Sequence, residues 1–198
     1  MKKQLRLLKQ KYLQNFVFIH INKTAGSSIE KALKLRFEHK TALQKRTEIG
    51  EELWQDKFVF GFVRNPWDKV VSHYHYRVRT NQTGLGDNHL SFEDWVRKAY
   101  GDNDPVYYDL PTMFMPQTNW LVDDQGELIV TFIGRFENLT DDFRTVCSQI
   151  GRHAELPHVK SSKRADYQRY YSDETREIIA TWFAEDVRRF DYRFEESE

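Results

Sequence analysis

The chain has 198 residues, a length that fits one domain with a hydrophobic core of its own. Thirty Lys and Arg residues balance thirty Asp and Glu residues, so the composition does not favour broad electrostatic attraction to nucleic acid or to an anionic membrane. The aromatic content of 15% argues against intrinsic disorder. We therefore expect a single domain over residues 1–198 and no nucleic-acid partner. Basic residues cluster in the first eleven positions and in segment 160–169, and we interpret both clusters as solvated faces.

The targeting and redox features of the chain are few. One cysteine, Cys147, excludes an internal disulfide and a Cys-based metal site, and its place on an apolar helical stripe predicts a core position. No apolar segment approaches the length that spans a bilayer, and the first fifteen residues lack the apolar block of a signal peptide. We therefore expect no integral membrane segment and a cytoplasmic location.

The apolar patterns predict strands that alternate with helices. The expected elements, in chain order, are a basic helical lead-in, a strand at 16–21, a helix at 27–37, a polar connector, a strand at 58–63, a helix from 66 to about 78, a surface loop at 80–90, a short helix opened by Ser91, an irregular stretch at 101–120, a strand at 128–133, a helix ending near 150, and a final long helix at about 172–190. This order indicates an α/β fold with a central, mostly parallel sheet flanked by helices in three layers, similar to that of the P-loop NTPases.

The most informative stretch joins the apolar run at 16–21 to the helical pattern that follows it. The connecting loop contains Lys23, Gly26 and small hydroxyl residues. This composition is typical of a phosphate-binding loop, in which backbone N–H groups and a helix N-terminus face the anion while the lysine adds a charge. The loop is not a Walker A loop, because there the lysine follows the glycine-rich segment and here Lys23 comes first.

A second candidate site begins where the apolar run at 58–63 ends. Arg64 follows this run directly, and Ser72 lies eight residues later, about two turns along the helix that Asn65 and Pro66 are expected to begin. Arginine offers a fork of donors to an oxyanion and serine adds a hydroxyl, so a second phosphate fits here. The alternative is an Arg64–carboxylate ion pair beside an exposed serine. A P-loop nucleotidase needs an acidic strand end for Mg²⁺, and an arginine at this position favours a metal-free site.

These two segments resemble known motifs. Segment 19–28, Ile-His-Ile-Asn-Lys-Thr-Ala-Gly-Ser-Ser, resembles the 5′-phosphosulfate-binding loop of sulfotransferases, and segment 62–72 resembles their 3′-phosphate motif. The similarity is to the sulfotransferase-2 type, which includes carbohydrate sulfotransferases, and it continues through 133–139 to 190–194. The family usually has proline where this chain has Asn22. Its Golgi members carry a membrane anchor, which we do not expect in this chain.

The resemblance implies 3′-phosphoadenosine 5′-phosphosulfate (PAPS) as donor and a metal-independent in-line transfer of its sulfuryl group to an acceptor hydroxyl of a carbohydrate or small molecule. It implies that Lys23 binds the 5′-phosphate and stabilises charge on the leaving phosphate. The other donor-binding residues that it implies are Thr24, Ala25, Gly26, Ser27 and Ser28 around the phosphosulfate, Arg64 and Ser72 at the 3′-phosphate, and Lys163 and Arg164 in a loop placed like one that closes over the nucleotide.

The transfer needs a general base for the acceptor hydroxyl. His39 follows the first helix, in a region that supplies catalytic histidines or carboxylates in carbohydrate-type relatives. His20 lies three residues before Lys23, although a histidine at a strand end also fits a hydrogen-bonded core position. Glu30 and Asp68 are further candidates.

Two alternative functions stay open. A kinase-like nucleotide phosphotransferase would require Mg²⁺ and ATP, and the strand-end arginine argues against it. A non-catalytic regulatory protein that binds the nucleotide would keep Lys23, Arg64 and Ser72 and would need no base. The acceptor and the oligomeric state cannot be read from the pattern.

Overall fold

The structure is a computed structural model that describes residues 2–88, 90–157 and 166–194. The chain divides into two compact units. Unit 1 comprises Met1–Val63 and Gln117–Lys160, and unit 2 comprises Arg64–Pro116 and Ser161–Glu198. Within the described ranges, no helix is both long enough and apolar enough to cross a lipid bilayer.

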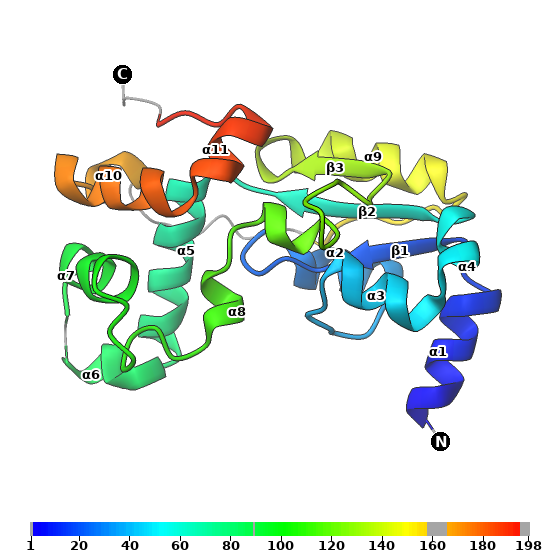
Figure 1. Cartoon of the computed structure of the whole chain (residues 1–198), viewed down its shortest axis with the longest axis horizontal. Helices are drawn as coiled ribbons and strands as arrows, with labels where there is room; N and C mark the ends of the chain where they lie inside the picture. The colour runs from blue at the N-terminus through cyan, green and yellow to red at the C-terminus, as the bar shows by residue number, and fades with distance from the viewer. Residues whose placement is uncertain (1, 89, 158–165, 195–198) are drawn as a thin grey trace. The chain divides into compact units, whose positions relative to one another are not determined.

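Unit 1 is built on a parallel sheet of three strands, in the order β1 (Phe16–Ile19), β2 (Phe58–Val63) and β3 (Phe132–Arg135) (Figure 1). The strands are nearly continuous apolar runs, as expected for a parallel sheet that is covered by other elements. The expected strand at 58–63 coincides with β2, and β1 ends two residues before the expected limit of 21. The predicted α/β fold with a parallel sheet flanked by helices is confirmed.

One face of this sheet carries the core of unit 1. Four phenylalanines of β1 and β2 pack there against α2 (Gly26–Leu33) and α9 (Leu139–Gln149). The cluster consists of Phe16, Phe18, Phe60, Phe62, Ile29, Leu33, Phe143, Val146, Cys147 and Ile150. Cys147 therefore lies in the core, as its place on an apolar stripe predicted. Gly134 of β3 leaves room for this packing, because a Cβ atom there would lie 2.4 Å from the Phe62 ring.

Unit 1 also contains elements that the sequence analysis missed. The expected polar connector forms α3 (Ala42–Ile49) and α4 (Glu51–Gln55), and α1 (Lys2–Tyr12) is the basic lead-in helix. Helix α3 starts with a capping box in which the Thr41 side chain accepts from the Gln44 backbone and the Gln44 side chain from the Thr41 backbone. The strand expected at 128–133 begins only at Phe132, because Leu128 instead forms an isolated antiparallel bridge with Val122.

Unit 2 is helical. Its elements are α5 (Pro66–Arg79), η1 (Gln82–Gly84), α6 (Leu85–Asn88), α7 (Phe92–Val96), the π-helical turn η2 (Arg97–Gly101), α8 (Pro111–Phe114), η5 (Tyr167–Tyr170), α10 (Asp173–Trp182) and α11 (Ala184–Phe190). The final helix expected at 172–190 is therefore two helices, separated by the fully buried Phe183. The expected loop at 80–90 contains η1 and α6, because Leu85 packs into the core.

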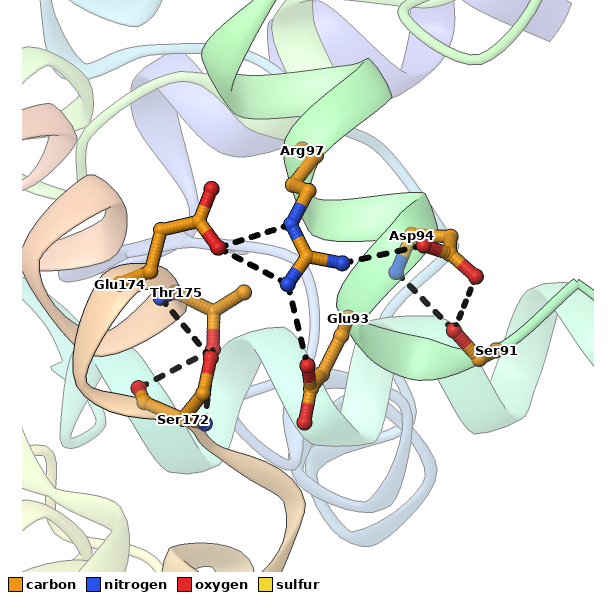
Figure 2. Close-up of polar contacts among 7 residues, drawn as sticks. All are labelled: Ser91, Glu93, Asp94, Arg97, Ser172, Glu174 and Thr175. Carbon is orange, nitrogen blue, oxygen red and sulfur yellow. Dashed lines mark hydrogen bonds and ion pairs between the residues drawn. The ribbon is translucent and has the colours of Figure 1, made fainter.

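A polar network ties α10 to α7 and η2 (Figure 2). Arg97 lies 2.8 Å from Glu174, 3.0 Å from Asp94 and 3.2 Å from Glu93. Ser91 caps α7 by accepting the Asp94 N–H at 3.1 Å, which confirms the predicted helix start. These ion pairs are exposed, so they fix orientation more than they add stability.

Candidate active site

The turn between β1 and α2 has an unusual backbone. Lys23 and Ala25 both have a φ of 66°, in the left-handed region that costs a residue with a side chain about 1–2 kcal/mol. The Thr24 hydroxyl braces the turn by donating to the Ile21 carbonyl at 2.9 Å. Helix α2 starts at Gly26, and the residue at its N-cap position, Ala25, contributes no capping hydrogen bond. The first N–H groups of α2 therefore have no capping side chain, which is the arrangement that suits an external anion.

The residues predicted to surround the phosphosulfate lie together in this turn and the first turn of α2. Ser27 is exposed, Lys23 and Ser28 are half-buried, and Thr24 is buried. The Thr24 hydroxyl is used inside the turn, so its remaining contribution to a ligand is its backbone N–H.

A steric constraint explains why position 26 is a glycine. A Cβ atom at this position would lie 1.9 Å from Cδ2 and 2.1 Å from Nε2 of His20. The His20 imidazole therefore covers the Gly26 Cα directly, and any side chain larger than hydrogen would displace the ring. The position of this histidine therefore requires a glycine in the loop.

Glu30 holds His20 in this position. His20 Nδ1 lies 2.9 Å from Glu30 Oε1, and the backbone N–H of Glu38 donates to the same oxygen at 3.2 Å. Both side chains of the pair are buried. The carboxyl group thus connects the end of β1, helix α2 and the segment that follows α2.

His39 is brought to the same place by the segment after α2. Its Nδ1 lies 2.8 Å from the His20 carbonyl oxygen, and the two imidazole centroids are 4.3 Å apart. Because a carbonyl oxygen only accepts, Nδ1 of His39 carries the proton and the lone pair lies on Nε2. The ring also contacts Phe37 and the fully buried Trp120 edge-to-face, and it is half-buried itself.

Burial sets the protonation of this cluster. Burial, together with the nearby His39, lowers the pKa of His20 to about 3. Burial also lowers the pKa of His39, although its hydrogen bond to the His20 carbonyl opposes the shift. Burial raises the pKa of Glu30 despite the hydrogen bond from Glu38. Both imidazoles are therefore neutral at neutral pH, and the His20–Glu30 contact involves no imidazolium.

Arg64, the first residue after β2, forms the ion pair that the sequence analysis left open. Its Nε and Nη2 lie 2.7 and 2.6 Å from Asp68 Oδ2, one helical turn away, and the arginine is buried. Ser72 is half-buried and follows Asp68 by four residues, so it lies on the same face of α5. The arginine fork, the carboxylate and the serine hydroxyl thus occur at successive turns.

The N-terminus of α5 is capped by its own sequence. Asn65 Oδ1 accepts from the backbone N–H groups of Trp67 and Asp68 at 3.1 and 3.5 Å, and Pro66 has no N–H to satisfy. Asn65 Nδ2 donates in turn to the Arg193 carbonyl at 2.9 Å. The predicted helix start is confirmed. The same Asn65 side chain also contacts segment 190–194, the last segment of the family resemblance.

The sequence did not predict that three ionisable residues would be buried, namely Lys69, Asp186 and Glu30. Lys69 and Asp186 are both almost fully buried, and burial together with Arg64 lowers the pKa of Lys69 to about 8 while Asp186 opposes the shift. Asp186 lies on the apolar stripe of the last helix pattern, and Glu30 lies on that of α2. An acidic residue on an apolar helical stripe was the signal that could have identified both as buried partners.

Two predicted residues, Lys163 and Arg164, lie outside the described part of the chain. Within that part, no group of three or more His, Cys, Asp or Glu side chains is arranged to hold a metal ion.

Comparisons with known proteins agree with the motifs. The profile of a family described as the sulfotransferase family matches residues 8–193. An uncharacterized protein of Archaeoglobus fulgidus is 37% identical over 114 residues, which cover 56% of this chain and 82% of that protein. The crystal structure of a sulfotransferase from Alicyclobacillus acidocaldarius superposes with a TM-score of 0.50 at 16% identity, covering 90% of this chain and 94% of that one. At this identity the structural match shows a common fold.

Proposed function

The chain belongs to the sulfotransferase family, and on that premise we propose that it transfers a sulfuryl group from PAPS to a hydroxyl group of a carbohydrate or small molecule. The observation that carries this proposal is the turn between β1 and α2. There a lysine, an uncapped helix N-terminus and two histidines held by hydrogen bonds occur within one unit.

The residues of this turn fit the phosphosulfate end of the donor. The backbone N–H groups at the start of α2 and the hydroxyls of Ser27 and Ser28 would surround the anion, and the helix dipole favours negative charge there. We assign to Lys23 the stabilisation of the charge that develops on the leaving 5′-phosphate.

The segment after β2 fits the 3′-phosphate by a different chemistry. Because Asn65 occupies the N-terminus of α5, binding there would rely on side chains, namely the guanidinium of Arg64 and the hydroxyl of Ser72. Asp68 orients the Arg64 fork through two contacts. Lys163 and Arg164 remain proposed nucleotide contacts on the strength of the resemblance alone.

We assign the general base to His39. Its Nδ1–H is engaged by the His20 carbonyl, which leaves Nε2 as the proton acceptor, and its lowered pKa keeps that nitrogen neutral. In the transfer, the acceptor oxygen forms a new bond to sulfur, the bond between sulfur and the 5′-phosphate oxygen breaks, and the acceptor proton moves to Nε2.

His20 and Glu30 then have a different role from the one first considered for them. His20 is buried against Gly26 and bonded to Glu30, and Glu30 is bonded to His20 and to the Glu38 backbone. We propose that both are positioning residues, which hold His39 and the turn in register. Asp68, paired with Arg64, is likewise not proposed as the base.

Turnover of PAPS labelled in its sulfuryl group tests this function. We expect transfer of the label to a hydroxyl acceptor in a screen of oligosaccharides, alcohols and phenols, without added metal. Replacing His39 by Gln should lower kcat by about 10²–10⁴-fold. The matched control is His153→Gln at an exposed position, which should leave kcat nearly unchanged. Stabilisation by Mg-ATP alone, with no response to adenosine 3′,5′-bisphosphate, would favour the kinase-like alternative. Nucleotide binding with no turnover would favour a regulatory protein.

A further inference from the structure

Helix α1 concentrates positive charge in an otherwise neutral chain. Its eleven residues include five Lys or Arg residues and no acidic residue, and the first acidic residue of the chain is Glu30. Positive and negative charges balance over the whole sequence. The positive charge of α1 is therefore local, and the helix offers a face that an anionic partner would recognise.

One side of α1 is fixed to unit 1. The Lys57 ammonium donates to the carbonyls of Lys11 and Gln14 at 2.9 and 2.7 Å, and the Lys45 ammonium donates to Gln10 Oε1 at 3.4 Å. These contacts hold the last turn of the helix on the body of the unit. The remaining faces of α1 are thereby presented in a defined orientation.

The other side of α1 exposes an apolar stripe. Leu5, Leu8 and Tyr12 are 60%, 52% and 67% exposed, and their spacing of three and four residues aligns them along the helix, roughly opposite Gln10. Leu13, 80% exposed, extends the apolar surface just beyond the helix. Four of the nine large apolar side chains that are exposed in the described residues therefore belong to this one short segment.

The charge of the helix restricts what can cover this stripe. A second copy of the chain would bring two basic helices together, and like charges oppose that contact. Lys9 and Lys11 fall on opposite sides of the apolar stripe in the helical projection, so their ammonium groups can reach outward beside it. A surface that is apolar below and anionic above satisfies both features, and a lipid bilayer with acidic headgroups is such a surface.

We propose that α1 binds the surface of an anionic lipid bilayer, with Leu5, Leu8 and Tyr12 at the boundary between headgroups and acyl chains and the flanking lysines among acidic headgroups. The interpretation of the basic start of the chain as a solvated face is revised accordingly. This inference does not depend on the proposed function, because it rests on the charge and exposure of α1 alone.

Co-sedimentation of the full chain with large unilamellar vesicles tests the proposal. We expect binding to vesicles of phosphatidylcholine mixed with phosphatidylglycerol, weakening as salt is added, and little binding to phosphatidylcholine alone. Leu8→Gln should reduce the partition coefficient at least about tenfold. Its matched control is Leu110→Gln, since Leu110 is 53% exposed in unit 2.

A charge reversal gives a second, independent arm. Lys9→Glu should weaken binding to the acidic vesicles about tenfold or more, whereas Arg144→Glu, a reversal at another exposed position, should leave it nearly unchanged. All four substitutions are at exposed positions, so we expect little change in melting temperature. Absence of binding to acidic vesicles would overturn the proposal, and so would equal losses in the control variants. Binding to polyglutamate but not to vesicles would identify an acidic protein partner instead, and loss of a dimer in Leu8→Gln would identify a second copy.

Discussion

Two strand-to-helix turns of this chain resemble anion sites, yet the helix that follows the first has no side-chain cap and the helix that follows the second is capped. At the start of α2, Ala25 provides no capping hydrogen bond and two residues adopt left-handed backbone angles. At the start of α5, Asn65 accepts two backbone N–H groups and Pro66 removes another. The backbone donors at the start of α2 therefore have no capping side chain, whereas Asn65 satisfies those at the start of α5.

Among substitutions in the two turns, the largest expected effect comes from Lys23 in the uncapped turn. Lys23→Met should lower kcat about 10²–10³-fold, because it removes the cation assigned to the leaving phosphate. Lys31→Met, in the helix α2 that follows this turn, is the matched control, since Lys31 is exposed. Steady-state assays with labelled PAPS compare the two, and equal losses in both variants would show that Lys23 has no special role.

Gly26→Ala should break the uncapped turn by steric means. The new Cβ would overlap the His20 ring, so we expect a loss of about 1–3 kcal/mol in the free energy of unfolding. Gly101→Ala is the control, because there the nearest atom, in Ile178, lies 3.7 Å from the built Cβ. Urea denaturation followed by circular dichroism measures both variants. Unchanged stability in Gly26→Ala would mean that His20 does not cover the turn.

The histidine cluster should make stability depend on pH. The pKa of His20 is about 3 in the folded protein and near 6.5 when unfolded. Between these values the unfolded chain binds the additional proton, so stability falls as pH drops from about 6.5 towards 3, by at most about 1.4 kcal/mol per pH unit. The raised pKa of Glu30 acts in the opposite direction, from its ordinary value of 4.5 upward in pH.

His20→Asn separates this titration from the structure, because the amide can still donate to Glu30 but does not titrate. We expect the slope of stability against pH to flatten in this variant and to persist in His153→Asn. Urea midpoints at a series of pH values provide the measurement. A slope that is unchanged by His20→Asn would assign the pH dependence to other groups.

Removing the cap of α5, or adding one to α2, should change the free energy of unfolding by smaller amounts. Asn65→Ala removes the Oδ1 atom that accepts two backbone N–H groups, and should cost about 1–2 kcal/mol of stability. The converse change, Ala25→Asp, adds a carboxylate to the uncapped helix, and we expect it to gain a few tenths of a kcal/mol in the free protein while weakening binding of adenosine 3′,5′-bisphosphate. Tighter nucleotide binding in Ala25→Asp would contradict the assignment of that N-terminus to an anion.

Local patterns predicted the elements that local physics determines. Strand β2 and the capped start of α5 follow from an apolar run and an Asn-Pro pair, and both occur as expected. Helix α3 was missed because its residues are mostly polar, although its capping box was readable at Thr41. The predicted start of strand β3 was wrong because Leu128 pairs with Val122. This pairing depends on the turn between the two residues and not on their apolar character.

The site was predicted less completely than the fold. The phosphate-loop residues are contiguous, so the sequence alone places them together. The His20–Glu30 and His39–His20 contacts join residues ten and nineteen positions apart, and they form only because α2 returns the chain to the end of β1. No spacing rule predicts such contacts. Glu30 is a candidate base in the sequence; the structure shows its contact with His20, and we propose that it positions this ring.

The central proposal is that the backbone donors and Lys23 of the first turn recognise the 5′-phosphate of the nucleotide, and that the Arg64 side chain recognises its 3′-phosphate. Isothermal titration calorimetry without metal, using adenosine 3′,5′-bisphosphate and adenosine 5′-phosphate, tests it most directly. We predict that Lys23→Met weakens both ligands about tenfold or more, whereas Arg64→Lys weakens the bisphosphate to a similar extent and leaves the 5′-phosphate unaffected. Equal effects of Arg64→Lys on both ligands, or no binding of either ligand to the unmodified chain, would contradict the account.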